Sequence, residues 1–112
     1  MIRKFGRKKG QRVAFMKGLA HNLITKESID TTVARAKSMR PMVERLVSVA
    51  KKQHLAGFRS LLAKLPKASA EKLFYEIAPR YKERKGGYLR ITKKAITRKR
   101  DNASLATIEF VK

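Results

Sequence analysis

Two histidines and eight carboxylates are the side chains of this 112-residue sequence that could support acid–base or metal chemistry. His21 and His54 are 33 positions apart, and no Cys or HExxH-like spacing accompanies them. The acidic residues are dispersed, and no two have the spacing of a metal site or an acid–base pair. A ribonuclease using both histidines is the enzymatic alternative, whereas histidines on a polar face that touch solvent or nucleic acid are the simpler interpretation. We therefore predict no enzyme, no catalytic residue, no metal site and no cofactor.

A glycine pair among cations is the second candidate site. Residues 80–90 read Arg-Tyr-Lys-Glu-Arg-Lys-Gly-Gly-Tyr-Leu-Arg. Gly86 and Gly87 indicate a turn with positive φ before a strand, and they also let a backbone approach phosphate closely. Tyr81 and Tyr88 are interleaved with cations, a combination used to stack on unpaired bases, with core packing as the alternative. No GxxxxGK[ST] motif is present to indicate nucleotide hydrolysis.

The positive charge is concentrated in two parts of the sequence. The net charge is +21, from 29 Lys and Arg against 8 Asp and Glu. Residues 1–26 carry 8 cations and no acid, residues 27–79 carry 10 cations and 5 acids, and residues 80–100 carry 10 cations and Glu83 alone. Solvated charged faces usually include acids for i,i+4 pairing, so these two bare blocks favour a polyanionic partner over mere solubility.

Several other classes of protein are disfavoured by composition. The absence of Cys excludes disulfides and thiolate chemistry and is compatible with a reducing compartment. No apolar run approaches the ~18–20 residues of a membrane span. The stretch Val13–Ile24 is interrupted by Lys17, His21 and Asn22, so it makes a poor signal-peptide core. An organelle presequence is an alternative use of the acid-free amino terminus, although that segment lacks Ser.

The hydrophobic periodicity predicts one domain preceded by an arm. Residues 1–12 contain two Gly and six cations with only Ile2 and Phe5 as apolar anchors, which predicts an extended basic arm that is disordered until bound. Thr32 is predicted to cap a helix in which Pro41 introduces a kink or a restart, and Ser69 to cap a later helix. The predicted helices cover residues 13–24, 33–50, 55–65 and 69–79, and the predicted strands cover residues 27–32, 88–94 and 105–111.

The predicted fold class is α+β. Its element order is helix, strand, three helices and two strands, and a two-layer α/β arrangement would bury every apolar stripe. We expect a small mixed sheet covered by helices, with residues 13–112 as a single RNA-binding domain after the basic amino-terminal arm. RNA is favoured over duplex DNA because no helix-turn-helix, zinc finger or basic region feeding heptads is evident. Cations on an arm, on turns and on a strand suit an irregular folded RNA.

Several segments together resemble the bacterial large-subunit ribosomal protein seventeen family. The likeness covers essentially the whole chain and ends with Asp101-Asn102-Ala103 and Ile108-Glu109. The segments that carry it are Gly6-Arg7-Lys8, Leu19-Ala20-His21-Asn22-Leu23-Ile24, Ile29-Asp30-Thr31-Thr32-Val33-Ala34-Arg35-Ala36-Lys37, Arg40-Pro41-Met42-Val43-Glu44, Ile77-Ala78-Pro79-Arg80-Tyr81 and Gly86-Gly87-Tyr88-Leu89-Arg90-Ile91. Two departures are an arm with fewer residues before the first helix and Leu89 where the family more often has Thr.

The resemblance implies a structural role on the large ribosomal subunit, bound to 23S ribosomal RNA, with no catalysis. It implies a cytoplasmic bacterial ribosome, with an organellar ribosome as the alternative, and large-subunit ribosomal protein thirty-two as a neighbour. A basic, nucleoid-type architectural protein is the alternative function. The candidate rRNA-binding residues are Arg3, Lys4, Arg7, Lys8, Lys9, Arg12, Lys17, Arg35, Lys37, Arg40, Arg80, Tyr81, Arg84, Lys85, Gly86, Gly87, Tyr88, Arg90, Arg98, Lys99 and Arg100.

Overall fold

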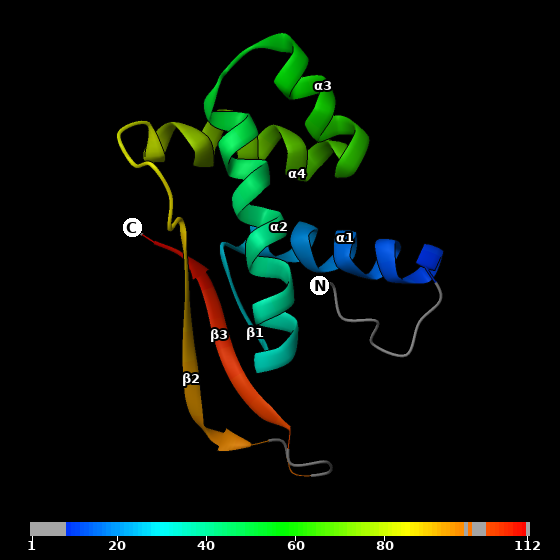
Figure 1. Cartoon of the computed structure of the whole chain (residues 1–112), viewed down its shortest axis with the longest axis vertical. Coiled ribbons are helices and arrows are strands. Elements are labelled where there is room, and N and C mark those ends of the chain that lie inside the picture. Colours follow the sequence, from blue (N-terminus) through cyan, green and yellow to red (C-terminus); the bar gives the residue numbers. More distant parts are fainter. Residues whose placement is uncertain (1–8, 98, 100–102, 112) are drawn as a thin grey trace.

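The fold consists of helices packed on a small sheet, in the order predicted from the sequence (Figure 1). The computed structural model describes residues 9–97, 99 and 103–111 of the chain. The order of helix, strand, three helices and two strands is confirmed, and so is the α+β class. The elements are α1 (Lys9–Lys26), β1 (Ser28–Thr32), α2 (Val33–Lys51), α3 (Leu55–Lys64), α4 (Lys67–Lys72), the π-helical turn η1 (Leu73–Ile77), the 3-10 turn η2 (Ala78–Tyr81), β2 (Leu89–Thr97) and β3 (Ser104–Phe110).

The first helix begins earlier than its apolar pattern predicts. Helix α1 begins at Lys9, so the prediction that residues 9–12 are extended is wrong. Lys, Gln and Arg are good helix formers, and their polar side chains extend the helix without adding to the apolar stripe used to place its start. The rest of the predicted arm, residues 1–8, lies outside the described residues. The buried side of α1 carries Met16, Ala20, Leu23 and Ile24.

The three strands form an antiparallel sheet in the order β1-β3-β2. The expectation of a mixed sheet is therefore wrong. Strands β2 and β3 follow one another in the chain and pair antiparallel, and β1 joins the other edge of β3, also antiparallel. Ile108 of β3 faces Ile29 on one side and Ile91 on the other. This apolar row makes β3 the centre of the sheet and of its buried face.

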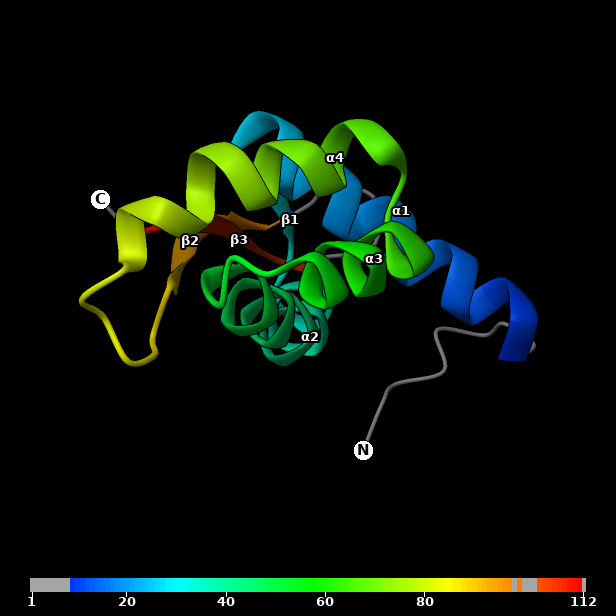
Figure 2. The ribbon, with the colours of Figure 1, turned by 90° about the horizontal axis from the view of Figure 1, so that it is seen from above.

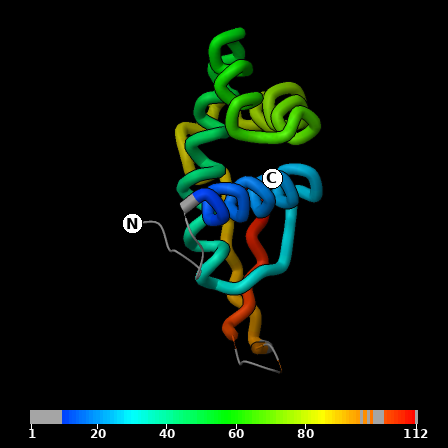
Figure 3. The backbone as a smooth tube through the Cα atoms, turned by 90° about the vertical axis from the view of Figure 1, so that its right-hand side faces the viewer, coloured from blue at the N-terminus to red at the C-terminus, as the bar shows by residue number. Residues whose placement is uncertain are grey.

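Helix α2 covers that buried face of the sheet. Thr32 caps the helix as predicted, because its Oγ1 accepts a hydrogen bond from the Arg35 N–H at 3.3 Å. The helix is a single element through Pro41. Its buried residues are Ala36, Met39, Val43, Leu46, Val47 and Ala50. Figure 3 shows α2 running along the sheet, with α1 lying across α2 and with α3 and α4 toward one end.

The fourth predicted helix is a run of three helical types. Helix α4 begins at Lys67, after Pro66, so Ser69 is not its cap. The Ser69 hydroxyl instead donates a hydrogen bond to the Pro66 carbonyl at 3.0 Å. The run continues through η1 and η2 to Tyr81, and Pro79 lies in the first turn of η2. From above, this run passes across one end of the sheet (Figure 2), which brings residues near 80 beside the start of β1.

Candidate nucleic-acid interface

The glycine pair forms the predicted turn between η2 and β2. Gly87 has φ of 63°, a left-handed conformation that favours glycine. The Arg84 Nε donates a hydrogen bond to the Gly86 carbonyl at 3.1 Å. Lys51 of α2 donates to the Arg84 carbonyl and, at 2.8 Å, to the Tyr88 hydroxyl. These contacts hold residues 82–87, which we call the glycine loop, in a defined place with all its side chains exposed.

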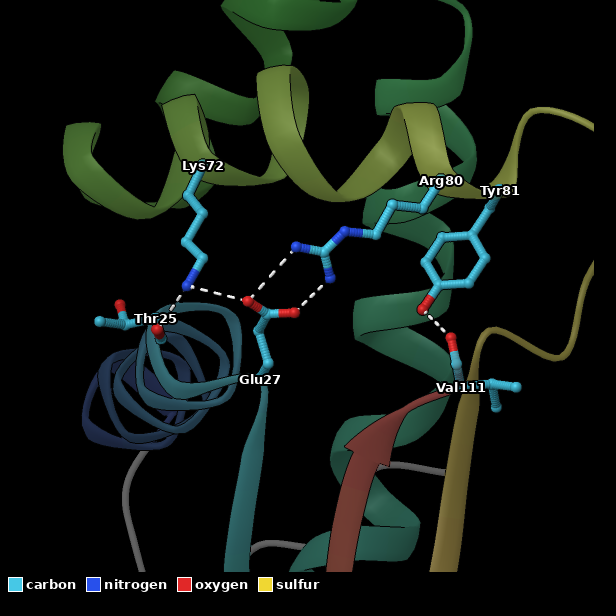
Figure 4. A network of polar contacts seen from close by, with 6 residues as sticks. All are labelled: Thr25, Glu27, Lys72, Arg80, Tyr81 and Val111. Carbon is cyan, nitrogen blue, oxygen red and sulfur yellow. Dashed lines mark hydrogen bonds and ion pairs between the residues drawn. The ribbon is translucent and has the colours of Figure 1, made fainter.

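Tyr81 and Tyr88 do not offer ring faces to a nucleic acid. Their exposed fractions are 5% and 2%, and their ring centroids lie 5.3 Å apart. The Tyr81 hydroxyl donates a hydrogen bond to the Val111 carbonyl (Figure 4). Burial raises the pKa of Tyr81. The prediction that these two rings contact RNA bases is therefore corrected: both rings pack in the core.

Arg80 belongs to an ion-pair cluster that links distant parts of the chain. Its guanidinium binds both carboxylate oxygens of Glu27, and Lys72 Nζ lies 3.3 Å from Glu27 Oε2 (Figure 4). Lys72 Nζ also donates to the Thr25 carbonyl at 2.6 Å. The hydrogen bond from Arg80 is the largest cause that lowers the pKa of Glu27, and Lys72 acts in the same direction. This Glu27 cluster joins α1 and β1 to the helical run that ends in η2.

The outer face of the sheet also carries ion pairs. Arg90 Nη2 lies 2.6 Å from Glu109 Oε1, across the β2–β3 pair. Lys94 Nζ lies 2.7 Å from Asp30 Oδ2, and the Thr107 hydroxyl donates to Asp30 Oδ1 at 2.7 Å. The hydrogen bond from Lys94, followed by that from Thr107, lowers the pKa of Asp30. The predicted RNA-binding residue Arg90 is thus engaged by a carboxylate of the same chain.

A third ion pair connects α2 to the glycine loop. Arg40 Nε lies 3.4 Å from Glu44 Oε1 on the same helix. The other oxygen of Glu44 accepts a hydrogen bond from the Tyr88 N–H at 2.9 Å. Arg40, like Arg80 and Arg90, therefore has part of its charge compensated within the fold.

A cationic groove lies where α1, α2 and the end of α3 meet. Its volume is about 580 Å³, and its floor is apolar. Five cations line it, and within the described part of the chain none of them forms an ion pair with an acid. These groove cations are Arg12, Lys17, Lys37, Arg45 and Lys64. We call this feature the α1–α2 groove.

The groove combines predicted and unpredicted residues. Arg12, Lys17 and Lys37 are among the RNA-binding candidates from the sequence, whereas Arg45 and Lys64 are not. Both missed residues lie in residues 27–79, where cations and acids are more nearly balanced in number. A signal for Arg45 exists in its position on α2, one helical turn after Pro41 and two turns after Lys37, but Lys64 joins the groove only through tertiary packing.

The remaining candidates are distributed more widely. Arg35 lies over the Phe15 ring, with 5.0 Å from its guanidinium carbon to the ring centroid, a cation–π arrangement. Lys99 is exposed. The predictions for Arg3, Lys4, Arg7, Lys8, Arg98 and Arg100 fall outside the described residues.

The two histidines occupy opposite ends of α3. His54 caps the helix, because its Nδ1 accepts a hydrogen bond from the Gly57 N–H at 2.9 Å. His21 lines a hollow against the other end of α3, and its buried Nδ1 has no hydrogen-bond partner among the described residues. A ten-residue helix is ~15 Å long, so the two imidazoles are not placed as an acid–base pair.

One aromatic residue that the sequence analysis did not single out is exposed. Tyr75, on the π-helical turn η1, has an exposed fraction of 63%. Its ring lies 5.7 Å from the Phe58 ring and 5.0 Å from the Phe74 ring, so packed aromatic side chains support it from behind. Only the folded structure separates this exposed ring from the buried Tyr81 and Tyr88.

In the part of the chain that the structure describes, no three His, Asp or Glu side chains gather as metal ligands would. No described helix has the length and apolar character needed to cross a membrane.

A small α+β fold, a net charge of +21 and a groove whose cations have no ion-pair partner among the described residues together define a polyanion-binding protein. Comparison with known proteins identifies its family. A family model described as "Ribosomal protein L17" matches residues 15–111. The chain belongs to this ribosomal protein L17 family, as the sequence resemblance indicates.

Curated relatives agree with that assignment over nearly their whole length. The large ribosomal subunit protein bL17 of Persephonella marina is 50% identical over 111 residues, which span 97% of this chain and 90% of that protein. The protein of the same name from Hydrogenobaculum sp. is 48% identical over 108 residues, with 96% and 92% covered. That of Fusobacterium nucleatum is 46% identical over 110 residues, with 97% and 94% covered.

Proposed function

We propose that this chain is a structural constituent of the large subunit of the bacterial ribosome, in the cytoplasm, and that it binds 23S ribosomal RNA. The family match over residues 15–111 is the observation that carries the proposal. The names of the relatives, all large ribosomal subunit proteins of bacteria, support it. The role is non-enzymatic, and the protein contributes to assembly of the subunit and hence to translation.

The RNA contacts belong to the cations that the fold leaves without acids. In the described part of the chain this set includes the groove cations together with Lys82, Arg84 and Lys85 of the glycine loop. Residues 1–8 add four cations to this set by sequence. Phosphate contacts of this kind position a protein on RNA without reading its sequence. Arg80 and Arg90 contribute less, because carboxylates of the chain already compensate them.

A neighbouring protein is the second part of the proposal. The family resemblance supports contact with large-subunit ribosomal protein thirty-two. Cross-linking of intact large subunits followed by mass spectrometry tests this contact. Cross-links from this chain only to other ribosomal proteins would overturn it without affecting the RNA-binding role.

Co-sedimentation is the experiment that tests the main proposal. We expect the protein to sediment with large subunits and to leave them only at high salt, since each phosphate contact makes affinity fall with salt concentration. Competition between structured 23S rRNA fragments and duplex DNA at physiological salt tests the alternative function. A preference for duplex DNA would support a nucleoid-type architectural protein and overturn the ribosomal role.

A further inference from the structure

The α1–α2 groove has a shape and lining that phosphate binding alone does not require. Its floor is apolar and includes two flexible Met side chains, which adapt to flat or irregular partners. The floor residues are Val13, Met16, Ala20, Met42, Leu46 and Leu65. A surface that bound only the backbone of a nucleic acid would gain nothing from this apolar hollow.

The charges around the floor select an anionic occupant. Arg12 and Lys17 approach from α1, Lys37 and Arg45 from α2, and Lys64 from the end of α3. Among the residues that the structure describes, no acidic one lines the groove. Cations from three elements therefore surround the same apolar floor. This arrangement suits a polyanion whose negative charges flank an uncharged, planar group.

Pro41 leaves one backbone carbonyl of α2 without its usual hydrogen-bond donor. In an α-helix the N–H of residue 41 would bond the carbonyl of Lys37, but proline has no N–H. Lys37 and Pro41 both line the groove, so the carbonyl that lacks its usual helical donor belongs to a groove-lining residue. A bound group with an N–H at its edge could supply the missing donor.

We propose that the α1–α2 groove receives one unstacked base of the bound ribosomal RNA. The base lies against the apolar floor, an N–H at its edge donates to the Lys37 carbonyl, and the groove cations bind the phosphates on either side. Single-stranded RNA segments are recognised in this way, with bases splayed out onto side chains and phosphates held by cations. This inference rests on the proposed function, because it names the part of the RNA that this surface takes.

A nucleic-acid strand is favoured over an acidic peptide by two features. The groove cations and the cations of the glycine loop have no ion-pair partners among the described residues, so the groove is not the only place where this chain offers uncompensated positive charge to the phosphates of a strand. A carbonyl without its helical N–H donor, on a residue of the groove lining, suits a planar base with N–H groups on its edge, whereas an apolar side chain of a peptide would offer that carbonyl no donor.

Filling the groove is the first test. Ser38 lines the groove, whereas Ser48 lies on the same helix outside it. We expect Ser38→Phe to weaken binding of 23S rRNA at least tenfold, in line with the loss of one base contact, while the salt dependence stays unchanged. The matched control Ser48→Phe should bind like the unmodified protein. Equal affinities for the two variants would overturn the proposal.

Restoring the helical donor is the second test, and it separates binding from stability. Pro41→Ala returns an N–H to the Lys37 carbonyl, so α2 becomes more stable and the melting temperature should rise. Binding of 23S rRNA should nevertheless weaken roughly three- to tenfold, because the carbonyl is no longer free for the base. A variant that melts higher and binds as tightly as the unmodified protein would overturn the assignment of this carbonyl.

Photochemical cross-linking locates the base directly. The full chain is bound to 23S rRNA that contains 4-thiouridine, irradiated, and analysed by mass spectrometry. Adducts on groove residues such as Met42 support the proposal, and their loss in Ser38→Phe confirms the position. Adducts confined to other surfaces, or a peptide of a neighbouring protein cross-linked in the groove of intact subunits, would overturn it. Failure of the unmodified protein to bind rRNA would instead contradict the proposed function itself.

Discussion

The outer sheet face and the α1–α2 groove are both cationic, but their charges have different surroundings. On the outer sheet face, Arg90 and Lys94 lie within 3 Å of carboxylate oxygens. In the groove, Lys37 and Arg45 approach an apolar floor, and the described residues of its lining include no acid. A cation that has a carboxylate partner contributes to the fold, whereas a cation without one remains available for phosphate. Net charge alone does not reveal this division.

The same division separates the cations that are prominent in the sequence from those that are prominent in the structure. Residues 80–100 form the densest cationic block after Glu27, yet Arg80, Arg90 and Lys94 from this block are ion-paired. Glu27 and Asp30, the partners of Arg80 and Lys94, lie more than fifty residues earlier in the chain. We conclude that counting charges by segment overestimates how many cations are available to RNA, because some of them form ion pairs with acids that are distant in sequence.

The largest expected effect comes from neutralising three groove cations. The triple variant Lys37→Gln, Arg45→Gln, Lys64→Gln should bind 23S rRNA roughly 50-fold more weakly at about 0.15 M salt and reduce the salt slope by about 2, since each single-strand phosphate contact contributes about 0.7. The control Arg80→Gln, Arg90→Gln, Lys94→Gln removes the same charge from paired positions and should change the slope by less than about 1. Equal slopes in filter-binding titrations would abolish the distinction between the two surfaces.

Stability should respond in the opposite order. Urea unfolding of the paired-cation triple variant should show a loss of stability, of which the partly exposed Arg80–Glu27 pair accounts for up to about 1 kcal/mol. The groove variant should lose no stability, since removing like charges relieves repulsion. A groove variant that unfolds more easily than the paired-cation variant would show that the groove cations hold the fold.

His54 lies outside both surfaces, so its replacement provides a control for effects on stability alone. His54→Ala removes the cap of α3 and should cost about 1 kcal/mol in urea unfolding, whereas His54→Asn retains a capping side chain and should recover most of it. Neither variant should alter rRNA affinity or its salt dependence. A change in RNA binding on replacement of His54 would bring this imidazole into the interface.

The smallest expected effect is on the pH dependence of stability. The folded pKa of Glu27 lies below its ordinary value of 4.5, so its ion pairs stabilise the fold above that pH and lose this contribution as the pH falls through the folded pKa. Below about pH 4.5 the free energy of unfolding should fall less steeply in Glu27→Gln than in the unmodified protein, by less than about 1 kcal/mol. The control Glu83→Gln, in the exposed glycine loop, should follow the unmodified protein.

Local features of the fold were predictable, whereas the arrangement of the site was not. The Thr32 cap and the turn at Gly87 depend on neighbouring residues, and both are confirmed. The sequence does not show that Tyr81 and Tyr88 are buried while Tyr75 is exposed, because their burial depends on how η2 and β2 pack together. The groove combines α1, α2 and the end of α3, so no single segment of sequence contains its pattern.

The topology of the sheet also constrains the order in which the strands can pair during folding. Ser28 of β1 pairs with Glu109 of β3, 81 positions later, and β2 pairs with the same late strand. Both edge strands must wait for the central strand, which is synthesised last of the three. Loop closure over such a distance slows folding, and until it occurs β1 keeps open backbone hydrogen-bonding groups. During that interval the net charge of +21 makes copies of the chain repel one another, which opposes self-association.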